Sequence, residues 1–198
     1  MARQPRVNLS GLTYHVWANA IAGAKLYRDA DDRDVALRFL GEEVALSKWI
    51  CLAYILMSTH FHLLLRLREP TLSSGLLRLN LRYARYYNDR YETRGHVFDG
   101  RFEHRIVEGR FDELETARYI ALKPVRANMC DVPERYPWSA FGSIIGLYPA
   151  VRIVDLRAAL APFGGSREAY RAYVEERDTR ERWGQARARP QKRAFVTR

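Results

Sequence analysis

Two histidines separated by one residue stand at the start of an apolar run, and this pattern constrains the fold more than any other. Residues 50–57 are apolar, Ser58 and Thr59 interrupt the run, and residues 63–65 are apolar again after the two histidines. Two such runs with a short break predict an antiparallel hairpin with strands at 50–57 and 60–67. Side chains alternate between the two faces of a strand, so His60 and His62 are expected on one face. Two imidazoles on one face can bind one divalent ion, although a histidine in a strand is more often structural.

The order of the other predicted elements indicates a mixed fold. Alternating apolar residues predict strands at 11–21 and within 97–108, and helical spacing predicts helices at 33–49 and 73–91. A third helix is predicted from about residue 112 to residue 123. The order strand, helix, strand, strand, helix, strand is that of the split βαβ fold. We therefore expect an α+β protein with a ferredoxin-like antiparallel sheet and helices packed on it.

Acidic residues and one proline predict where two of these helices begin and end. Asp31 or Asp32 is expected to cap the first helix. Asp112 is expected to cap the third helix in a capping-box-like arrangement with Glu115. Pro124 disfavours helical geometry at the residue before it, so the third helix is expected to end or kink there.

Charge points to a polyanionic partner. The 198 residues include 33 Lys and Arg against 23 Asp and Glu, a formal net charge of +10. Arginine binds phosphate through two parallel hydrogen bonds, so an Arg-rich basic surface favours nucleic acid. A GC-rich genome that favours arginine codons would give the same composition without such a partner.

Length and hydropathy indicate one folded domain and a tail. We expect a folded domain over 1–145 and a C-terminal extension over 146–198, of which 177–198 is a basic, mobile tail that touches nucleic acid or only solvent. No apolar run has the length of a membrane span, and the N-terminus lacks a signal-peptide pattern. A cytoplasmic protein without a membrane partner is the expectation.

Several short motifs together resemble a known family. The chain is similar to the REP-associated tyrosine transposases, a branch of the HUH single-tyrosine transposases associated with repetitive extragenic palindromes. The motifs occur in the family's order and cover roughly residues 6 to 145: 14–17, 56–64, 83–88, 95–102, 118–127 and 136–139.

The resemblance implies an activity and a set of site residues. Proteins of this family cleave and rejoin single-stranded or hairpin DNA through a 5′-phosphotyrosine intermediate, with a divalent metal such as Mg²⁺ or Mn²⁺. Carried over to this chain, Tyr119 would be the nucleophile, and His60 and His62 would be the metal ligands. By pattern alone, a role for Tyr119 in packing the helix against the sheet is favoured over a catalytic one, because buried tyrosines are common. Other tyrosines are rival nucleophiles by the same criterion: Tyr83, Tyr86, Tyr87 and Tyr91.

Lys123 departs from the family pattern. The family usually has asparagine at this position, four residues after the tyrosine, where the two side chains share a helix face. A protonated lysine cannot bind a metal, so Lys123 either places a positive charge on the phosphate or marks weakened activity. Arg101, Arg105 and Arg126 are candidate phosphate contacts, or else solvated surface charges.

Two alternatives stay open. One is a non-enzymatic DNA-binding derivative of the same fold. The other is an RNA-binding module on a ferredoxin-like sheet, which the histidines disfavour because such modules normally display stacking aromatics. His15 is expected to be a structural histidine that could border the site. The sequence leaves open the DNA sequence recognised and whether the protein is a monomer or a homodimer.

Overall fold

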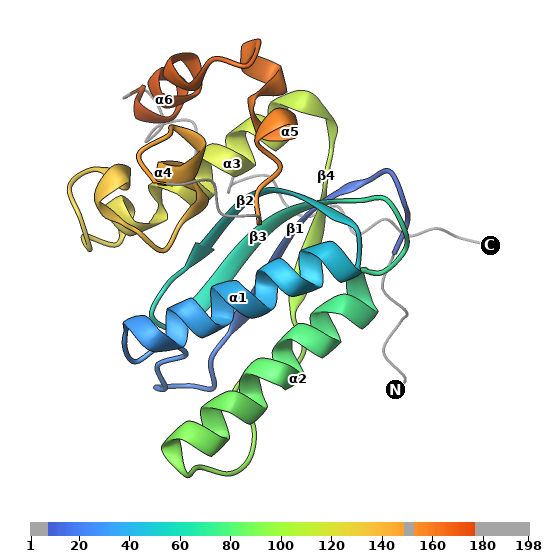
Figure 1. The fold of residues 1–198 in the computed structure, drawn as a ribbon, viewed down its shortest axis with the longest axis vertical. Helices are drawn as coiled ribbons and strands as arrows, with labels where there is room; N and C mark the ends of the chain where they lie inside the picture. The colour runs from blue at the N-terminus through green and yellow to red at the C-terminus, as the bar shows by residue number, and fades with distance from the viewer. Residues whose placement is uncertain (1–7, 149–152, 177–198) are drawn as a thin grey trace, which may run out of the picture.

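A four-stranded antiparallel sheet forms the centre of the structure (Figure 1). The computed structural model describes residues 8–148 and 153–176, so the tail predicted at 177–198 lies outside the described residues. The strands lie in the order β2 (Trp49–Leu56), β3 (His60–Leu67), β1 (Thr13–Asn19) and β4 (Glu103–Val107), and all neighbours are antiparallel. The predicted hairpin and the ferredoxin-like α+β fold are confirmed.

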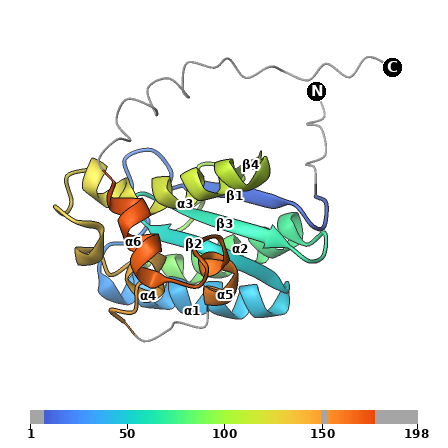
Figure 2. The ribbon, with the colours of Figure 1, turned by 90° about the horizontal axis from the view of Figure 1, so that it is seen from above.

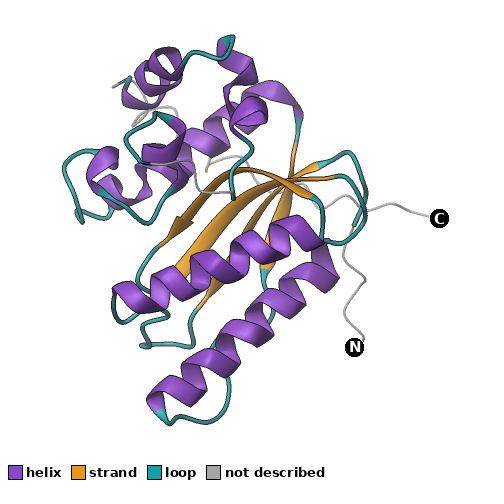
Figure 3. Ribbon diagram, in the orientation of Figure 1, coloured by secondary structure: helices purple, strands orange, loops and turns teal. Residues whose placement is uncertain are grey.

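Helices cover both faces of the sheet. Helices α1 (Ala30–Leu46) and α2 (Leu72–Tyr91) lie on one face, and α3 (Gly109–Arg126) lies on the other (Figures 1 and 2). A group of short helices follows α3 and packs at one end of the sheet (Figure 3). They are η1 (Pro133–Arg135), α4 (Ala140–Ile144), α5 (Leu156–Leu160), η2 (Ala161–Phe163) and α6 (Arg167–Glu175). A sheet covered in this way does not offer the open face that the RNA-binding alternative requires.

The two faces of the sheet differ in chemistry. The face under α1 and α2 is apolar, and Tyr14, Val16, Phe61 and Leu63 are all buried there. The face under α3 combines a smaller apolar cluster with polar side chains. Strand pairing aligns Trp17 with His62, which places the histidines of β1 and β3 on the α3 face. The predicted alternation of the histidines with Phe61 is therefore confirmed.

Two predicted helix caps are wrong. The N-cap of α1 is Asp29, whose carboxylate accepts a hydrogen bond of 3.0 Å from the backbone of Asp32, so the helix begins before both predicted caps. Asp112 lies inside the first turn of α3 and reaches back to accept from the backbone N–H of Glu108, 3.0 Å away. Several acidic residues occur near each helix start, and local spacing does not select among them.

Of the expected end or kink of α3 before Pro124, the end is wrong. The helix continues through Pro124 to Arg126, although the proline removes one backbone donor. Ile120, Ala121 and Pro124 are buried, and this packing outweighs the lost hydrogen bond. The consequence is that Lys123 keeps helical geometry one turn after Tyr119.

The residues that follow α4 pack against the main core and against α3. Tyr170 and Val174 of α6 belong to the main core, and the Arg118 guanidinium of α3 donates to the backbone carbonyl of Glu176. The Tyr173 hydroxyl donates to Glu115 at 2.6 Å.

Among the described residues, no helix combines the length and hydropathy needed to cross a bilayer.

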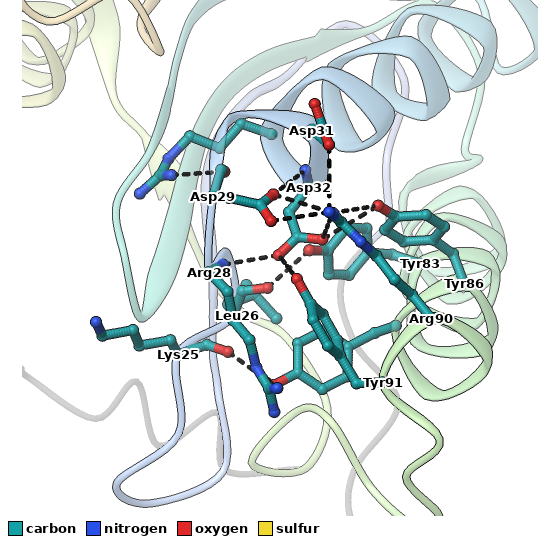
Figure 4. A network of polar contacts seen from close by, with 12 residues as sticks. Lys25, Leu26, Arg28, Asp29, Asp31, Asp32, Tyr83, Tyr86, Arg90 and Tyr91 are labelled. Carbon is teal, nitrogen blue, oxygen red and sulfur yellow. Dashed lines mark hydrogen bonds and ion pairs between the residues drawn. The ribbon is translucent and has the colours of Figure 1, made fainter.

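A buried carboxylate joins the start of α1 to the end of α2 (Figure 4). Asp32 is 0% exposed and accepts hydrogen bonds from the Tyr91 hydroxyl at 2.8 Å and from Arg90 at 2.6 Å. It also accepts from the Tyr86 hydroxyl and from the backbone of Arg28. A buried charge with this many donors is stabilising only while all of them are in place.

We expect Asp32→Ala to lower the free energy of unfolding by about 3 kcal/mol, because it leaves the buried ends of the Tyr86 and Tyr91 hydroxyls without their acceptor. Arg90 loses one carboxylate partner and keeps its ion pairs with Asp29 and Asp31. Asp31→Ala is the matched control, since the Asp31 side chain is 79% exposed in its ion pair with Arg90. It should cost less than about 1 kcal/mol. Urea denaturation of both variants provides the measurement, and equal losses would contradict the assignment.

Candidate active site

Helix α3 lies along β3 in a fixed register. Glu113 near the start of α3 accepts two hydrogen bonds from Arg66 of β3, at 2.8 and 2.9 Å. Further along the helix, the Tyr119 ring meets His62, and the Lys123 ammonium meets His60. The ten residues from Glu113 to Lys123 span about 15 Å of helix, and the six from Arg66 to His60 span about 20 Å of strand. The two lengths are similar enough for both ends of the helix segment to contact the strand. The register brings Tyr119 and Lys123 over the histidines.

Three histidines form a cluster under Tyr119. The ring centroids of His60 and His62 are 5.1 Å apart, with the rings nearly perpendicular. His15 of β1 lies on the other side, and its Nε2 is 2.9 Å from Nδ1 of His62. The Tyr119 ring approaches both His15 and His62 edge-on, with centroid distances of 5.9 Å. His15 and His62 are buried, whereas His60 and Tyr119 are half-buried.

The hydrogen bonds of His60 define its tautomer. Its Nε2 is 3.2 Å from Nζ of Lys123, and its Nδ1 is 3.0 Å from the Thr59 hydroxyl oxygen. An ammonium group can only donate, so Nε2 is the acceptor and carries no proton. We therefore assign the ring proton to Nδ1, which donates to Thr59.

All three imidazoles are neutral at neutral pH. Burial, followed by the charge of Lys123, lowers the pKa of His60 to about 4. Burial, followed by the charges of Arg105 and Lys123, lowers the pKa of His15 to about 3. Burial, followed by the charge of Lys123, lowers the pKa of His62 still further. The cluster is thus an uncharged, partly desolvated surface with a cation beside it.

Two cations flank Tyr119. The Lys123 ammonium lies 5.1 Å from the centroid of the Tyr119 ring, and the Arg126 guanidinium lies 5.7 Å from it. Among the described residues, none of the ion pairs involves Lys123. A cation without a carboxylate partner, beside a half-buried tyrosine, is an arrangement suited to an anionic ligand such as a phosphate.

The other two candidate phosphate contacts lie elsewhere. Arg105 of β4 donates to both carboxylate oxygens of Asp112, at 2.7 and 2.9 Å, and to Thr116 at 2.6 Å. This contact joins β4 to α3. Arg101 is exposed and lines a groove of about 380 Å³ between α2 and residues 95–102. Of the three candidate arginines, Arg126 is the one that the structure places beside Tyr119.

The residues present do not fit a divalent cation. No group of three or more His, Cys, Asp or Glu side chains within residues 8–148 and 153–176 could hold a metal ion. The Nε2 lone pair of His60, which a metal would need, already accepts from Lys123. A divalent ion about 4 Å from that ammonium would be repelled by roughly 8 kcal/mol at an effective dielectric constant of 20. The metal site at His60 and His62 stays a prediction that this geometry does not support.

The rival tyrosines occupy the opposite face of the sheet. They lie on α2, and each hydroxyl donates to a partner there, as Tyr83 does to the carbonyl of Leu26 at 2.7 Å and Tyr91 does to Asp32. Burial is the largest cause that raises the pKa of both Tyr83 and Tyr91. A buried hydroxyl with a raised pKa is a poor nucleophile. Of these five tyrosines, Tyr119 is the one that lies beside the histidines.

His15, expected at the border of the site, lies within the histidine cluster, and Trp17, for which there was no expectation from the sequence, lies beside it. The Trp17 ring lies 5.1 Å from the His15 ring and 6.2 Å from the His62 ring. The two residues are two positions apart on β1, so their side chains lie on the same face of the strand. This spacing is the one feature of the sequence that could have indicated their place beside the site. That signal becomes informative once the pairing of β1 with β3 is known.

Comparisons with known proteins show a likeness of fold and no related sequence. No family model and no curated protein matches the chain. One similar solved structure is a REP-associated tyrosine transposase bound to a REP hairpin, with a TM-score of 0.62 and 18% identity over 76% of this chain and 90% of that chain. Another is the tRNA(His) guanylyltransferase from Saccharomyces cerevisiae, with a TM-score of 0.44 and 9% identity over 87% of this chain and 80% of that chain, too low to compare folds. The first likeness shows the shared fold.

The contact between Asp112 and Arg105 predicts a pH-dependent stability. Burial acts to raise the pKa of Asp112, but the hydrogen bonds from Arg105 and from the Glu108 backbone outweigh it, and the pKa is lowered. A lowered pKa stabilises the folded state above the unfolded-state pKa near 4, and this contribution is lost as the pH falls through the folded pKa. We expect Asp112→Asn to cost about 2 kcal/mol at pH 7 and progressively less below about pH 4.

Urea denaturation from pH 8 to pH 3 measures this difference. Asp131→Asn is the matched control, because Asp131 forms an exposed ion pair with Arg135 and should cost less than about 1 kcal/mol. A cost for Asp112→Asn that does not change with pH would contradict the prediction.

Proposed function

We propose that this protein cleaves and rejoins single-stranded or hairpin DNA, with Tyr119 as the nucleophile. The observation that carries the proposal is the contact of Tyr119 and Lys123, both on α3, with the histidine cluster of the sheet. The six motifs that resemble the tyrosine transposases support it, as does the fold shared with a transposase that binds a hairpin.

The proposed reaction exchanges one phosphodiester for another. The Tyr119 oxygen bonds to phosphorus, and the bond between phosphorus and the 3′ oxygen breaks. The phenol loses one proton and the departing 3′ oxygen gains one, so the products are a 5′-phosphotyrosine and a 3′-hydroxyl. The reverse attack by a 3′-hydroxyl rejoins a strand, because a phenolate with a reference pKa near 10 is a good leaving group.

The surrounding residues have distinct proposed roles. Lys123 and Arg126 place positive charge where the phosphate carries negative charge. The hydrogen bond between His15 and His62 fixes the His62 ring, and the one between His60 and Thr59 fixes the His60 ring. Arg105 holds β4 against α3 through its ion pair with Asp112, and exposed Arg101 is a contact for DNA outside the site.

The first test removes only the nucleophilic oxygen. We expect Tyr119→Phe to retain folding and DNA binding and to abolish the covalent adduct with a labelled hairpin that has a single-stranded extension. Tyr148→Phe is the control, because Tyr148 is 40% exposed and donates only to the backbone of Glu134. Denaturing gels with Mg²⁺, with Mn²⁺ and with a chelator detect the adduct.

Two results would contradict this assignment. An adduct that persists in Tyr119→Phe would place the nucleophile elsewhere. A native protein that binds the hairpin and forms no adduct under any of these conditions would favour the DNA-binding derivative.

The second test concerns the partner. Phosphate contacts release counterions, and about four of them on a single strand give a slope near −3 for log affinity against log salt. We expect affinity for the hairpin to fall on the order of 50-fold between 50 and 200 mM salt. Fluorescence anisotropy measures it, with an unstructured oligonucleotide of equal length as the weaker-binding control. Affinity that does not change with salt would rule out binding through phosphates.

A further inference from the structure

We propose that the Lys123 ammonium takes the place of a divalent cation in this site, so that the protein binds and cleaves its phosphodiester without a divalent metal. This inference rests on the proposed function for its cleavage step. Its first test, metal binding, does not depend on that function.

The His60 contact supplies the first argument. An imidazole binds a metal through the lone pair of an unprotonated ring nitrogen. In His60 that nitrogen is Nε2, and its lone pair accepts from Lys123 at 3.2 Å. The other nitrogen carries the ring proton toward Thr59, at 3.0 Å, and cannot bind a metal. The ammonium and a metal ion therefore compete for one lone pair.

The ligand count supplies the second argument. Nδ1 of His62 is engaged with His15 at 2.9 Å, which leaves Nε2 as the single ligating nitrogen of that ring. The described residues contain no group of three His, Cys, Asp or Glu side chains able to hold an ion. One free imidazole nitrogen beside a fixed cation is not a binding site for Mg²⁺, which requires an octahedral set of oxygen ligands.

The electrostatic setting of Lys123 supplies the third argument. Lys48 and Lys123 differ in their partners. Lys48 forms an ion pair with Glu69 at 2.6 Å, whereas Lys123 contacts only neutral groups in the described structure, namely the His60 imidazole and the Tyr119 ring. Lys123 is half-buried in a helix that continues past it, so its charge is held beside Tyr119.

These three observations assign a chemical role. A phosphate beside Tyr119 would receive the fixed charge of Lys123 on a non-bridging oxygen, where a metal-dependent enzyme places its ion. The charge is already in place before the substrate binds, so no ion has to be recruited. Negative charge that develops during attack by the phenol is offset by this ammonium.

Metal binding to the full-length protein is the first test. Mn²⁺ is titrated into the native chain while the imidazole proton resonances are followed by NMR, and isothermal titration calorimetry follows the heat. We expect no saturable binding at His60 or His62 up to millimolar Mn²⁺. Saturable binding that broadens these resonances and disappears in His60→Ala would overturn the proposal, whether or not the protein cleaves DNA.

Adduct formation with a chelator is the second test. We expect the yield of native adduct in EDTA to lie within about twofold of the yield in Mg²⁺. Lys123→Met should lower the rate of adduct formation about a hundredfold in EDTA, and Lys123→Arg should retain more activity because it retains the charge. Lys48→Met is the matched control and should form adduct at the native rate.

The outcomes separate this inference from the proposed function. A native adduct that forms in Mg²⁺ or Mn²⁺ and falls more than tenfold in EDTA would overturn the inference and leave the proposed function standing. An equal rate in Lys123→Met and the native protein would also overturn it. If no adduct forms in any condition, the proposed function fails, and the Mn²⁺ titration alone decides whether Lys123 occupies the place of a metal.

Discussion

The register of α3 on the sheet is the constraint on which the candidate site depends. The sheet carries the histidines and α3 carries Tyr119 and Lys123, so the site exists only where these two elements face each other. Ion pairs from Arg66 to Glu113 and from Arg105 to Asp112 hold the start of the helix, and Ile120 is fully buried further along it. A shift of one residue would rotate Tyr119 by about 100° away from His62.

The C-terminal segment supports this helix from its other side. Tyr173 and the backbone of Glu176 contact Glu115 and Arg118, whose side chains lie on the part of α3 turned toward α6. Arg118 is buried, and its guanidinium also lies 4.9 Å from the Tyr173 ring centroid. Because Arg118 directly precedes Tyr119, packing of α6 helps to fix the orientation of the tyrosine.

Local sequence patterns predicted the features that depend only on residues close together in the chain. The hairpin and the common face of His60 and His62 follow from the alternation of side chains along a strand. The path of α3 through Pro124 did not follow, because burial of the last turn overrides the preference of the residue before proline. The contacts of His15 with His62 and of Lys123 with His60 depend on the register between separate elements, which no local spacing encodes.

The charged residues show most clearly why the site could not be identified without the fold. Arg105 and Arg126 look alike in the sequence, yet Asp112 neutralises Arg105 and Arg126 lies at the Tyr119 ring. The role proposed for Lys123 likewise depends on its contact with the His60 imidazole. An ammonium carries half the charge of a divalent ion, so it offsets less negative charge on a phosphate but is bound covalently to the helix that carries the nucleophile. The proposed cleavage therefore depends on how accurately α3, packed on β2 and β3, positions the nucleophile and the charge.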